Sequence, residues 1–222
     1  MSLLVKICGL KTPEMLDAAL DAGADMVGFV FFPPSPRHIA TPDAARALGA
    51  RVEGRARKVA LTVDADESLL EQIVETLRPD MLQLHGRETP HRVERLRGYF
   101  GLPVMKALPV AEARDLEAVQ RYSEVADWLL FDARAPKEAT RPGGLGQPFD
   151  WHLLENVDVV LPFMLSGGLT PDNVAEALRM TRAPAVDVSS GVERAPGEKD
   201  AEKIRAFIRN AREAASTMMS NA

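Results

Sequence analysis

The chain has 222 residues, of which 46% are hydrophobic and 27% are charged, a balance typical of a globular protein with a large core. Its formal net charge is -5 and it contains no long basic block, so nucleic acid is not expected as a partner. A single cysteine, Cys8, excludes an internal disulfide and fits a reducing compartment.

Membrane and export signals are not evident in the sequence. No apolar run approaches the roughly 18 residues of a membrane-spanning helix, and the first residues lead into a strand rather than into an apolar leader segment. We therefore expect a cytoplasmic protein without membrane contact. Because the overall charge is negative, an anionic ligand would need a local positive site.

Short apolar runs alternate with longer amphipathic runs along the chain. The first amphipathic run has the signals of a helix: Thr12 suits the cap, Pro13 the first turn and Gly23 the exit. The apolar runs predict strands at residues 3–8, 25–32, 58–63, 81–84, 104–108, 128–132, 163–166 and 185–188. The amphipathic runs predict helices at residues 12–22, 41–50, 67–77, 90–99, 110–122, 151–155, 171–178 and 200–215, followed by a frayed tail.

Eight strand–helix units predict a parallel sheet, because parallel strands need long crossover connections. That number of units in about 200 residues is the lower size limit of a (β/α)8 barrel. A doubly wound open sheet is the alternative, but it usually carries a G-x-G-x-x-G motif after its first strand. Here Cys8 and Gly9 occupy that place, and the pair Gly144 and Gly146 does not complete such a motif. We therefore predict a single (β/α)8 TIM barrel domain spanning residues 1–222.

The most distinctive stretch surrounds Asp132. The apolar run at residues 128–131 ends on this carboxylate, and a long Gly-rich loop follows before Asp150 and Trp151 open the next segment. In a barrel, the carboxyl ends of the strands and the loops after them build the active site. Asp132 is therefore a candidate for proton transfer, although an isolated Asp in such a place more commonly caps a helix or forms a turn. Asp150 is most simply a helix cap.

Cys8 ends the first predicted strand and would face Asp132 across the mouth of a barrel. A free cysteine is usually a small buried hydrophobe. The pKa of a thiol, ordinarily about 8.5, can nevertheless be tuned into the range of a general base. The sequence therefore leaves both a structural and a catalytic interpretation open for Cys8.

The loops after the seventh and eighth predicted strands both carry serine and glycine, and barrels commonly bind phosphate there. Glycine lets a ligand approach the backbone, whose N–H groups act as donors together with serine hydroxyls. Either loop alone would be an ordinary turn. Together they predict a phosphate site formed by Ser166, Gly167, Gly168, Ser189, Ser190 and Gly191.

Four further residues are candidates for substrate binding. Arg37 follows three prolines in a short loop, so its guanidinium should be held in place to bind a carboxylate, unless it is an ordinary surface arginine. Gln83 and His85 lie two residues apart and share one side of the fourth strand, and Asp187 lies on the eighth strand. The four histidines lack metal-ligand spacing and no second cysteine assists them, so we predict no metal.

Several motifs, in one order from residue 4 to about residue 208, resemble the phosphoribosylanthranilate isomerase family of tryptophan biosynthesis. The resemblance implies a (β/α)8 barrel that needs no metal or cofactor. It also implies conversion of N-(5-phosphoribosyl)anthranilate to its 1-deoxyribulose 5-phosphate isomer by an Amadori rearrangement. The motifs are Lys6-Ile7-Cys8-Gly9-Leu10, Gly28-Phe29-Val30-Phe31, Ser35-Pro36-Arg37, Gln83-Leu84-His85-Gly86, Phe131-Asp132, Gly143-Gly144-Leu145-Gly146, Phe149-Asp150-Trp151, Ser166-Gly167-Gly168-Leu169, Val186-Asp187-Val188-Ser189-Ser190-Gly191-Val192-Glu193, Pro196-Gly197 and Lys199-Asp200.

The resemblance implies roles for individual residues. Cys8 matches the general base, Asp132 the general acid, and Arg37 the residue that meets the anthranilate carboxylate. The serines and glycines after the seventh and eighth strands match the phosphate site, to which we also assign Gly144 and Gly146.

Two residues depart from the family pattern near the phosphate end. Leu145 stands where Thr is usual, and Ser166 stands where Ala is common. Either change could alter affinity for the phosphate, but neither removes a catalytic group.

The implied chemistry explains the residue types. Asp132 must be protonated to give a proton to the furanose ring oxygen, and partial desolvation at the barrel mouth would favour that form. Ring opening gives a Schiff base, Cys8 takes the adjacent sugar proton, and the enolamine tautomerises to the ketone. No redox step occurs, so no nicotinamide or flavin is needed.

Two alternatives remain at this level. A histidine-pathway isomerase shares the fold and the reaction type, but that family places Asp where Cys8 stands. A non-catalytic phosphosugar-binding barrel would have no need to retain both Cys8 and Asp132. In every case we expect a phosphorylated small molecule as the ligand, and a monomer or a weak homodimer.

Overall fold

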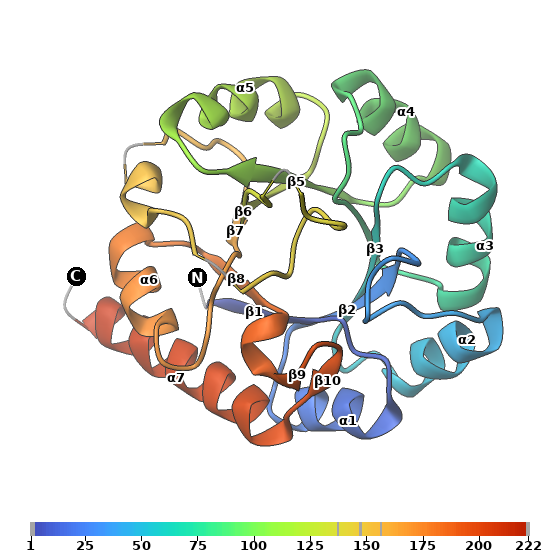
Figure 1. Ribbon diagram of the computed structural model, residues 1–222, viewed down its shortest axis with the longest axis horizontal. Helices are drawn as coiled ribbons and strands as arrows, with labels where there is room; N and C mark the ends of the chain where they lie inside the picture. Colours follow the sequence, from blue (N-terminus) through green and yellow to red (C-terminus); the bar gives the residue numbers. More distant parts are fainter. Residues whose placement is uncertain (1–2, 137, 147, 156, 221–222) are drawn as a thin grey trace.

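The computed structural model describes residues 3–136, 138–146, 148–155 and 157–220. Eight parallel strands pair in sequence order, and β1 also pairs with β8, so the sheet closes into a barrel (Figure 1). Closure confirms the predicted barrel and excludes the open sheet. The strands are β1 (Leu4–Cys8), β2 (Met26–Phe31), β3 (Arg57–Thr62), β4 (Met81–Leu84), β5 (Val104–Val110), β6 (Trp128–Ala133), β7 (Phe163–Leu165) and β8 (Ala185–Val188).

Helices form an outer ring around these strands (Figure 1). A two-stranded antiparallel hairpin, β9 (Glu193–Ala195) and β10 (Glu198–Lys199), follows the short 3-10 turn η3 (Ser190–Val192). None of the helices in the described ranges is both long and apolar enough to cross a bilayer. The other helical elements are α1 (Pro13–Asp21), α2 (Pro42–Arg51), α3 (Glu67–Leu77), α4 (Pro90–Phe100), η1 (Ala113–Glu117), α5 (Ala118–Ser123), η2 (Trp151–Leu154), α6 (Val174–Thr181) and α7 (Ala201–Ser220).

Side-chain caps explain why the first helices begin where the sequence predicts. Thr12, Thr41 and Thr89 each accept a hydrogen bond from a backbone N–H in the first turn, and each is followed by proline. Proline suits this position because its missing N–H would have had no partner within the helix. Asp66 caps α3 in the same way, without proline.

Several predicted boundaries are wrong, for local as well as tertiary reasons. Strand β5 continues to Val110 because it pairs with β6 as far as Ala133, so η1 and α5 start later than the expected helix. The predicted helix at residues 151–155 is the 3-10 turn η2, capped by Asp150. Helix α6 starts at Val174 rather than residue 171, because the side chain of Asn173 binds the backbone of the preceding turn.

The last boundary concerns the tail. Helix α7 continues to Ser220 instead of fraying after residue 215, although Ala214 is the last of its residues to be buried. The β9–β10 hairpin was likewise not expected from the sequence. Residues 221–222 lie outside the described residues.

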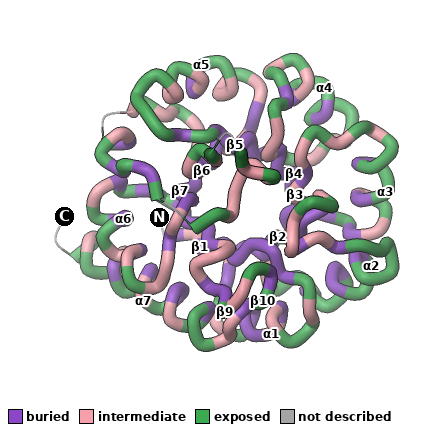
Figure 2. The backbone as a smooth tube through the Cα atoms, in the orientation of Figure 1, coloured by how far each residue is buried: buried purple, intermediate pink, exposed green. Residues whose placement is uncertain are grey.

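The barrel interior is built in layers along the strands. Apolar residues near the start of each strand fill the amino-terminal end of the barrel interior. Polar residues that follow them by two positions point to the same inward face, nearer the carboxyl end. Gln83 follows Met81 in this way, and Asp132 follows Leu130. Figure 2 shows the buried segments concentrated in the strands, with exposed segments on the helices. Alternation therefore places the polar side chains above a packed floor formed by Met26, Val59, Met81, Met105, Ala107, Leu130, Met164 and Ala185.

Candidate active site

A cavity opens at the carboxyl ends of the barrel strands. It brings together most of the residues predicted from the sequence, but two predicted residues do not line it: Gln83 is fully buried behind His85, and Gly191 packs against the Leu169 carbonyl. The predicted residues that line it are Cys8, Arg37, His85, Asp132, Gly144, Gly146, Ser166, Gly167, Gly168, Asp187, Ser189 and Ser190.

Asp132 lies at the end of β6 in a chain of polar contacts. Its Oδ2 is 3.0 Å from Nε2 of His85, and Nδ1 of His85 is 3.1 Å from Nε2 of Gln83. The backbone N–H of Ala133 donates to the other carboxyl oxygen. Gln83 thus orients His85, and His85 orients Asp132, which explains why a buried amide stands two residues before the histidine. This supporting position replaces the direct substrate contact expected for Gln83.

The loop after β6 lies directly over this carboxyl group. A Cβ added to Gly143 would collide with Oδ2 of Asp132 and would lie 2.8 Å from Nε2 of His85. Such contacts are closer than real Cβ atoms tolerate, so glycine is required for the loop to approach. The loop shields the Asp132–His85 pair from solvent, and Asp132 is only 5% exposed.

Cys8 lies on β1 beside a buried ion pair. Nζ of Lys6 is 2.8 Å from Oδ1 of Asp187, and the hydroxyl of Ser166 donates to the other Asp187 oxygen at 3.1 Å. Gly28 leaves the space in which the side chains of Cys8 and Lys6 converge, because a Cβ there would lie 2.8 Å from Sγ of Cys8 and 3.2 Å from Cε of Lys6. The thiol therefore has a cation for a neighbour.

The charges around Cys8 act in opposite directions. Burial raises the pKa of the Cys8 thiol, the charge of Lys6 lowers it, and the Asp187 carboxylate raises it. The net direction is upward, so the surroundings of the resting thiol disfavour the thiolate. Burial alone would lower the pKa of Lys6, but Asp187 and Cys8 outweigh burial and raise it. Lys6 is thus held charged next to the thiol.

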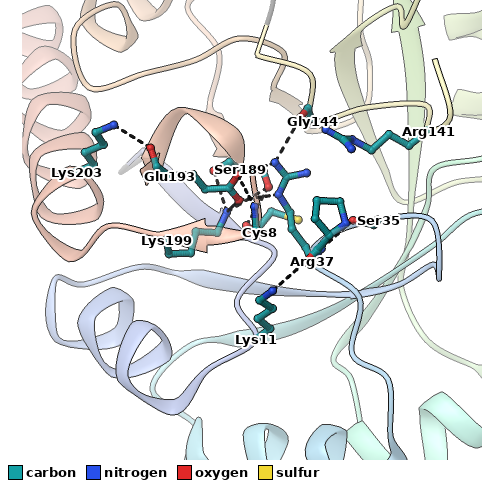
Figure 3. A network of polar contacts seen from close by, with 12 residues as sticks. Cys8, Lys11, Ser35, Arg37, Arg141, Gly144, Ser189, Glu193, Lys199 and Lys203 are labelled. Atoms are coloured by element: carbon teal, nitrogen blue, oxygen red, sulfur yellow. Dashed lines mark hydrogen bonds and ion pairs between the residues drawn. The ribbon is translucent and has the colours of Figure 1, made fainter. Parts of the chain in front are cut away.

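Arg37 lies on the loop after β2 and is held by Glu193 (Figure 3). Its Nε and one terminal nitrogen donate to the two Glu193 oxygens at 2.7 and 2.8 Å. Lys199 donates to the same carboxylate at 2.8 Å and to the Ser189 carbonyl at 2.8 Å. Ser189 in turn donates to the Cys8 carbonyl at 3.1 Å. The guanidinium is fixed as predicted, but by a carboxylate of the protein itself.

This network shifts the ionisation of its members. Burial alone would raise the pKa of Glu193, but hydrogen bonds from Arg37 and the charge of Lys199 lower it to about 2. Burial lowers the pKa of Lys199 to about 8 against the opposing attraction of Glu193. Glu193 therefore stays ionised at every physiological pH and keeps Arg37 in place.

Three of these residues, Lys6, Glu193 and Lys199, lie in the family motifs but received no role from the sequence. A signal existed for Lys6, because a lysine at an inward position within an apolar strand must find a partner when buried. Glu193 and Lys199 gave no such signal, since the hairpin that turns them inward was not predicted. Within the described ranges, no group of three or more His, Cys, Asp or Glu side chains is arranged to hold a metal ion.

The two departures from the family pattern have different environments. Ser166 is buried and bound to Asp187, whereas Leu145 lines the cavity and is 38% exposed. The Ser166 hydroxyl therefore stabilises the carboxylate of Asp187, which is the ion-pair partner of Lys6.

The closed barrel and the ionisable groups at the carboxyl ends of its strands place this chain in the class of (β/α)8-barrel enzymes. The family profile described as N-(5'phosphoribosyl)anthranilate (PRA) isomerase matches residues 5–210. A relative from Bradyrhizobium sp. (strain ORS 278), named N-(5'-phosphoribosyl)anthranilate isomerase, is 68% identical over 96% of this chain and 97% of its own length. A relative of the same name from Nitrobacter winogradskyi is 64% identical over 98% of this chain and 96% of its own.

Solved structures agree with these relatives. The crystal structure of phosphoribosyl anthranilate isomerase from Thermotoga maritima superposes with a TM-score of 0.85 at 36% identity, covering 95% of this chain and 99% of that one. A structure of the same enzyme type in complex with reduced 1-(o-carboxyphenylamino)-1-deoxyribulose 5-phosphate superposes with a TM-score of 0.82 at 34% identity, over the same shares. The chain belongs to the N-(5'-phosphoribosyl)anthranilate isomerase family.

Proposed function

We propose that the protein converts N-(5-phosphoribosyl)anthranilate to 1-(2-carboxyphenylamino)-1-deoxy-D-ribulose 5-phosphate in L-tryptophan biosynthesis. The reaction is an intramolecular aldose–ketose isomerisation. The observation that carries this proposal, beside family membership, is that Cys8 and Asp132 line one cavity from different strands. An Amadori rearrangement needs an acid and a base that act on one bound sugar.

Asp132 is the proposed acid, and it protonates the furanose ring oxygen as the C–O bond breaks. The contacts of His85 suit this role because Gln83 can present either its amide nitrogen or its oxygen to Nδ1. In the contact that the structure shows, the Gln83 amide nitrogen donates to Nδ1, so Nε2 carries the proton and donates to Asp132. Rotation of the amide reverses both bonds and lets Nε2 accept from the protonated carboxyl group. Gln83 and His85 can therefore serve both forms of Asp132 as its proton moves to the ring oxygen.

Cys8 is the proposed base. After ring opening, the iminium makes the adjacent sugar C–H acidic, and the thiolate removes that proton to give an enolamine, which tautomerises to the ketone. Because burial disfavours the thiolate, the charge of Lys6 is what makes this base attainable. The ring C–O bond breaks and protons move between the substrate and the two side chains without net oxidation, so the proposal requires no redox cofactor or metal.

The two anionic groups of the substrate are assigned to opposite sides of the cavity. The proposed phosphate site combines Ser189, Ser190 and the loop at Gly167 and Gly168. Arg37 is the proposed partner of the anthranilate carboxylate, with Glu193 holding the guanidinium in position. We also propose that residues 1–222 form one domain, that the protein acts in the cytoplasm, and that it is a monomer or a weak homodimer.

Turnover of N-(5-phosphoribosyl)anthranilate by the purified protein tests the function. Cys8→Ser and Asp132→Asn should each lower kcat by roughly 10²–10⁴, the usual contribution of one proton-transfer group. Their affinity for the reduced product analogue should stay close to that of the parent. Asp150→Asn is the matched control, because this exposed carboxylate caps η2 away from the cavity.

The outcomes separate function from mechanism. A parent protein that does not turn over the substrate contradicts the proposed activity. Near-parental rates in both Cys8→Ser and Asp132→Asn would retain the activity but refute the assigned roles.

A further inference from the structure

The charged residues that line the cavity have partners, with one exception among the described residues. Asp187 is paired with Lys6, Arg37 with Glu193, and Arg134 with Glu112. Asp132 contacts His85. Arg141 also lines the cavity, yet over the ranges that the structure describes its guanidinium contacts no carboxylate within ion-pair distance.

The environment of Arg141 suits an anion rather than solvent. The residue is half-buried, and its Nε is buried without a hydrogen-bond partner among the described atoms. One terminal nitrogen lies 3.5 Å from the Gly144 carbonyl. Burying a guanidinium donor without a partner is costly, so an acceptor supplied by a ligand would stabilise this arrangement.

Arg37 and Arg141 converge on the same atom. A terminal nitrogen of Arg37 lies 3.4 Å from the Gly144 carbonyl that Arg141 also approaches, and Figure 3 shows the two side chains reaching it from different elements. Both contacts are long, and two cations share one weak acceptor. An anion bound between the two guanidinium groups would relieve their repulsion and replace these weak contacts with charge-assisted ones.

The loop itself indicates which substrate anion this is. Gly146 lies next to the proposed phosphate site, since a Cβ there would be 3.6 Å from Oγ of Ser190. Gly144 lies directly against Arg37, since a Cβ there would be 2.6 Å from Nη1 of the guanidinium. Arg141 comes earlier in the loop and also borders a second hollow beside His85 and Arg134. It therefore lies toward the end of the cavity away from the phosphate.

We propose that Arg141 is a substrate-binding residue that completes a two-arginine clamp with Arg37 for the aryl carboxylate of the substrate. The inference rests on the proposed function and adds a residue to its carboxylate site. Arg37 alone has much of its hydrogen-bonding capacity occupied by Glu193, so the second guanidinium supplies donors that the first cannot. The loop after β6 thereby couples carboxylate binding to its own position over Asp132.

Calorimetric binding of three ligands to the parent and to Arg141→Gln tests the clamp. The ligands are reduced 1-(o-carboxyphenylamino)-1-deoxyribulose 5-phosphate, its anilino analogue without the carboxylate, and its analogue without the phosphate. Arg141→Gln should weaken both carboxylated ligands by about 10- to 100-fold, the usual range for a charge-assisted hydrogen bond. It should change binding of the anilino analogue by less than about threefold, and Arg141→Lys should recover part of the loss.

Arg87→Ala is the matched control for charge. Arg87 is exposed at the same mouth and borders the second hollow but not the cavity, so its removal should affect all three ligands slightly and alike. If Arg141→Gln weakened binding of the anilino analogue as much as binding of the full ligand, Arg141 would not bind the aryl carboxylate and the clamp would be refuted. Unchanged binding of all three ligands by Arg141→Gln would refute it as well. If the parent neither turns over the substrate nor binds the reduced product, the proposed function fails and the clamp fails with it.

Discussion

Glu193→Gln is the perturbation that most directly tests how the site is held. The substitution keeps the size of the side chain but leaves Arg37 and Lys199 facing each other without the carboxylate between them. The pKa of Glu193 falls from an ordinary value of 4.5 to about 2, and a difference of that size corresponds to about 3 kcal/mol in favour of the charged form. Breaking a buried ion pair costs about 3–5 kcal/mol in other proteins, which agrees.

We therefore expect Glu193→Gln to lower the free energy of unfolding by about 3 kcal/mol at pH 7. For a chain of this size, the melting temperature should fall by about 6–12 °C. Because the pKa of Glu193 is lowered in the folded state, its contribution is complete above about pH 4.5 and is lost as the pH falls toward 2. The difference between parent and variant should thus be constant between about pH 5 and 7 and shrink below that window.

Urea unfolding of the parent, Glu193→Gln, Arg37→Met and the double variant provides the measurement. The double variant should be more stable than the sum of the two single changes predicts, because the second substitution removes a cation that the first left unpaired. In steady-state kinetics, Glu193→Gln should raise KM more than it lowers kcat, since Arg37 would no longer be held for binding. A variant within about 1 kcal/mol of the parent at pH 7, or strict additivity in the cycle, would refute this reasoning.

Two further predictions concern the acid and the base. Gly143→Ala should lower kcat by at least about 10-fold, because its Cβ would collide with Oδ2 of Asp132. The control Gly98→Ala has open space around its Cβ and should leave kcat unchanged. If Gly143→Ala had the same kcat as the parent, the loop would not close over the acid. The pKa of Cys8 should rise further in Lys6→Met and fall in Asp187→Asn, because the first removes the charge that lowers it and the second a charge that raises it. Thiolate ultraviolet absorbance reports Cys8 alone, since it is the single cysteine, and shifts of the same sign in both variants would contradict the proposed electrostatics.

Local patterns in the chain were enough to predict the architecture and several of the residues that line the cavity. Apolar and amphipathic runs alternate, and Thr-Pro caps mark several helix starts, so the eight units could be recognised without any knowledge of contacts. A barrel then requires strand ends to meet at one mouth, which brought Cys8 and Asp132 together. Period-two alternation likewise placed Gln83 and His85 on one face.

The partners of these residues, in contrast, depend on the folded barrel. Lys6 and Asp187 are 181 positions apart, and Arg37 and Glu193 are 156 apart, so no local pattern could pair them. The β9–β10 hairpin turns Glu193 and Lys199 inward through pairing that the sequence did not reveal. Such pairings require closure of the barrel, which brings β8 and the segment after it beside β1. The direction of the Cys8 pKa follows from that closure as well, because burial and buried charges act only once the barrel has formed.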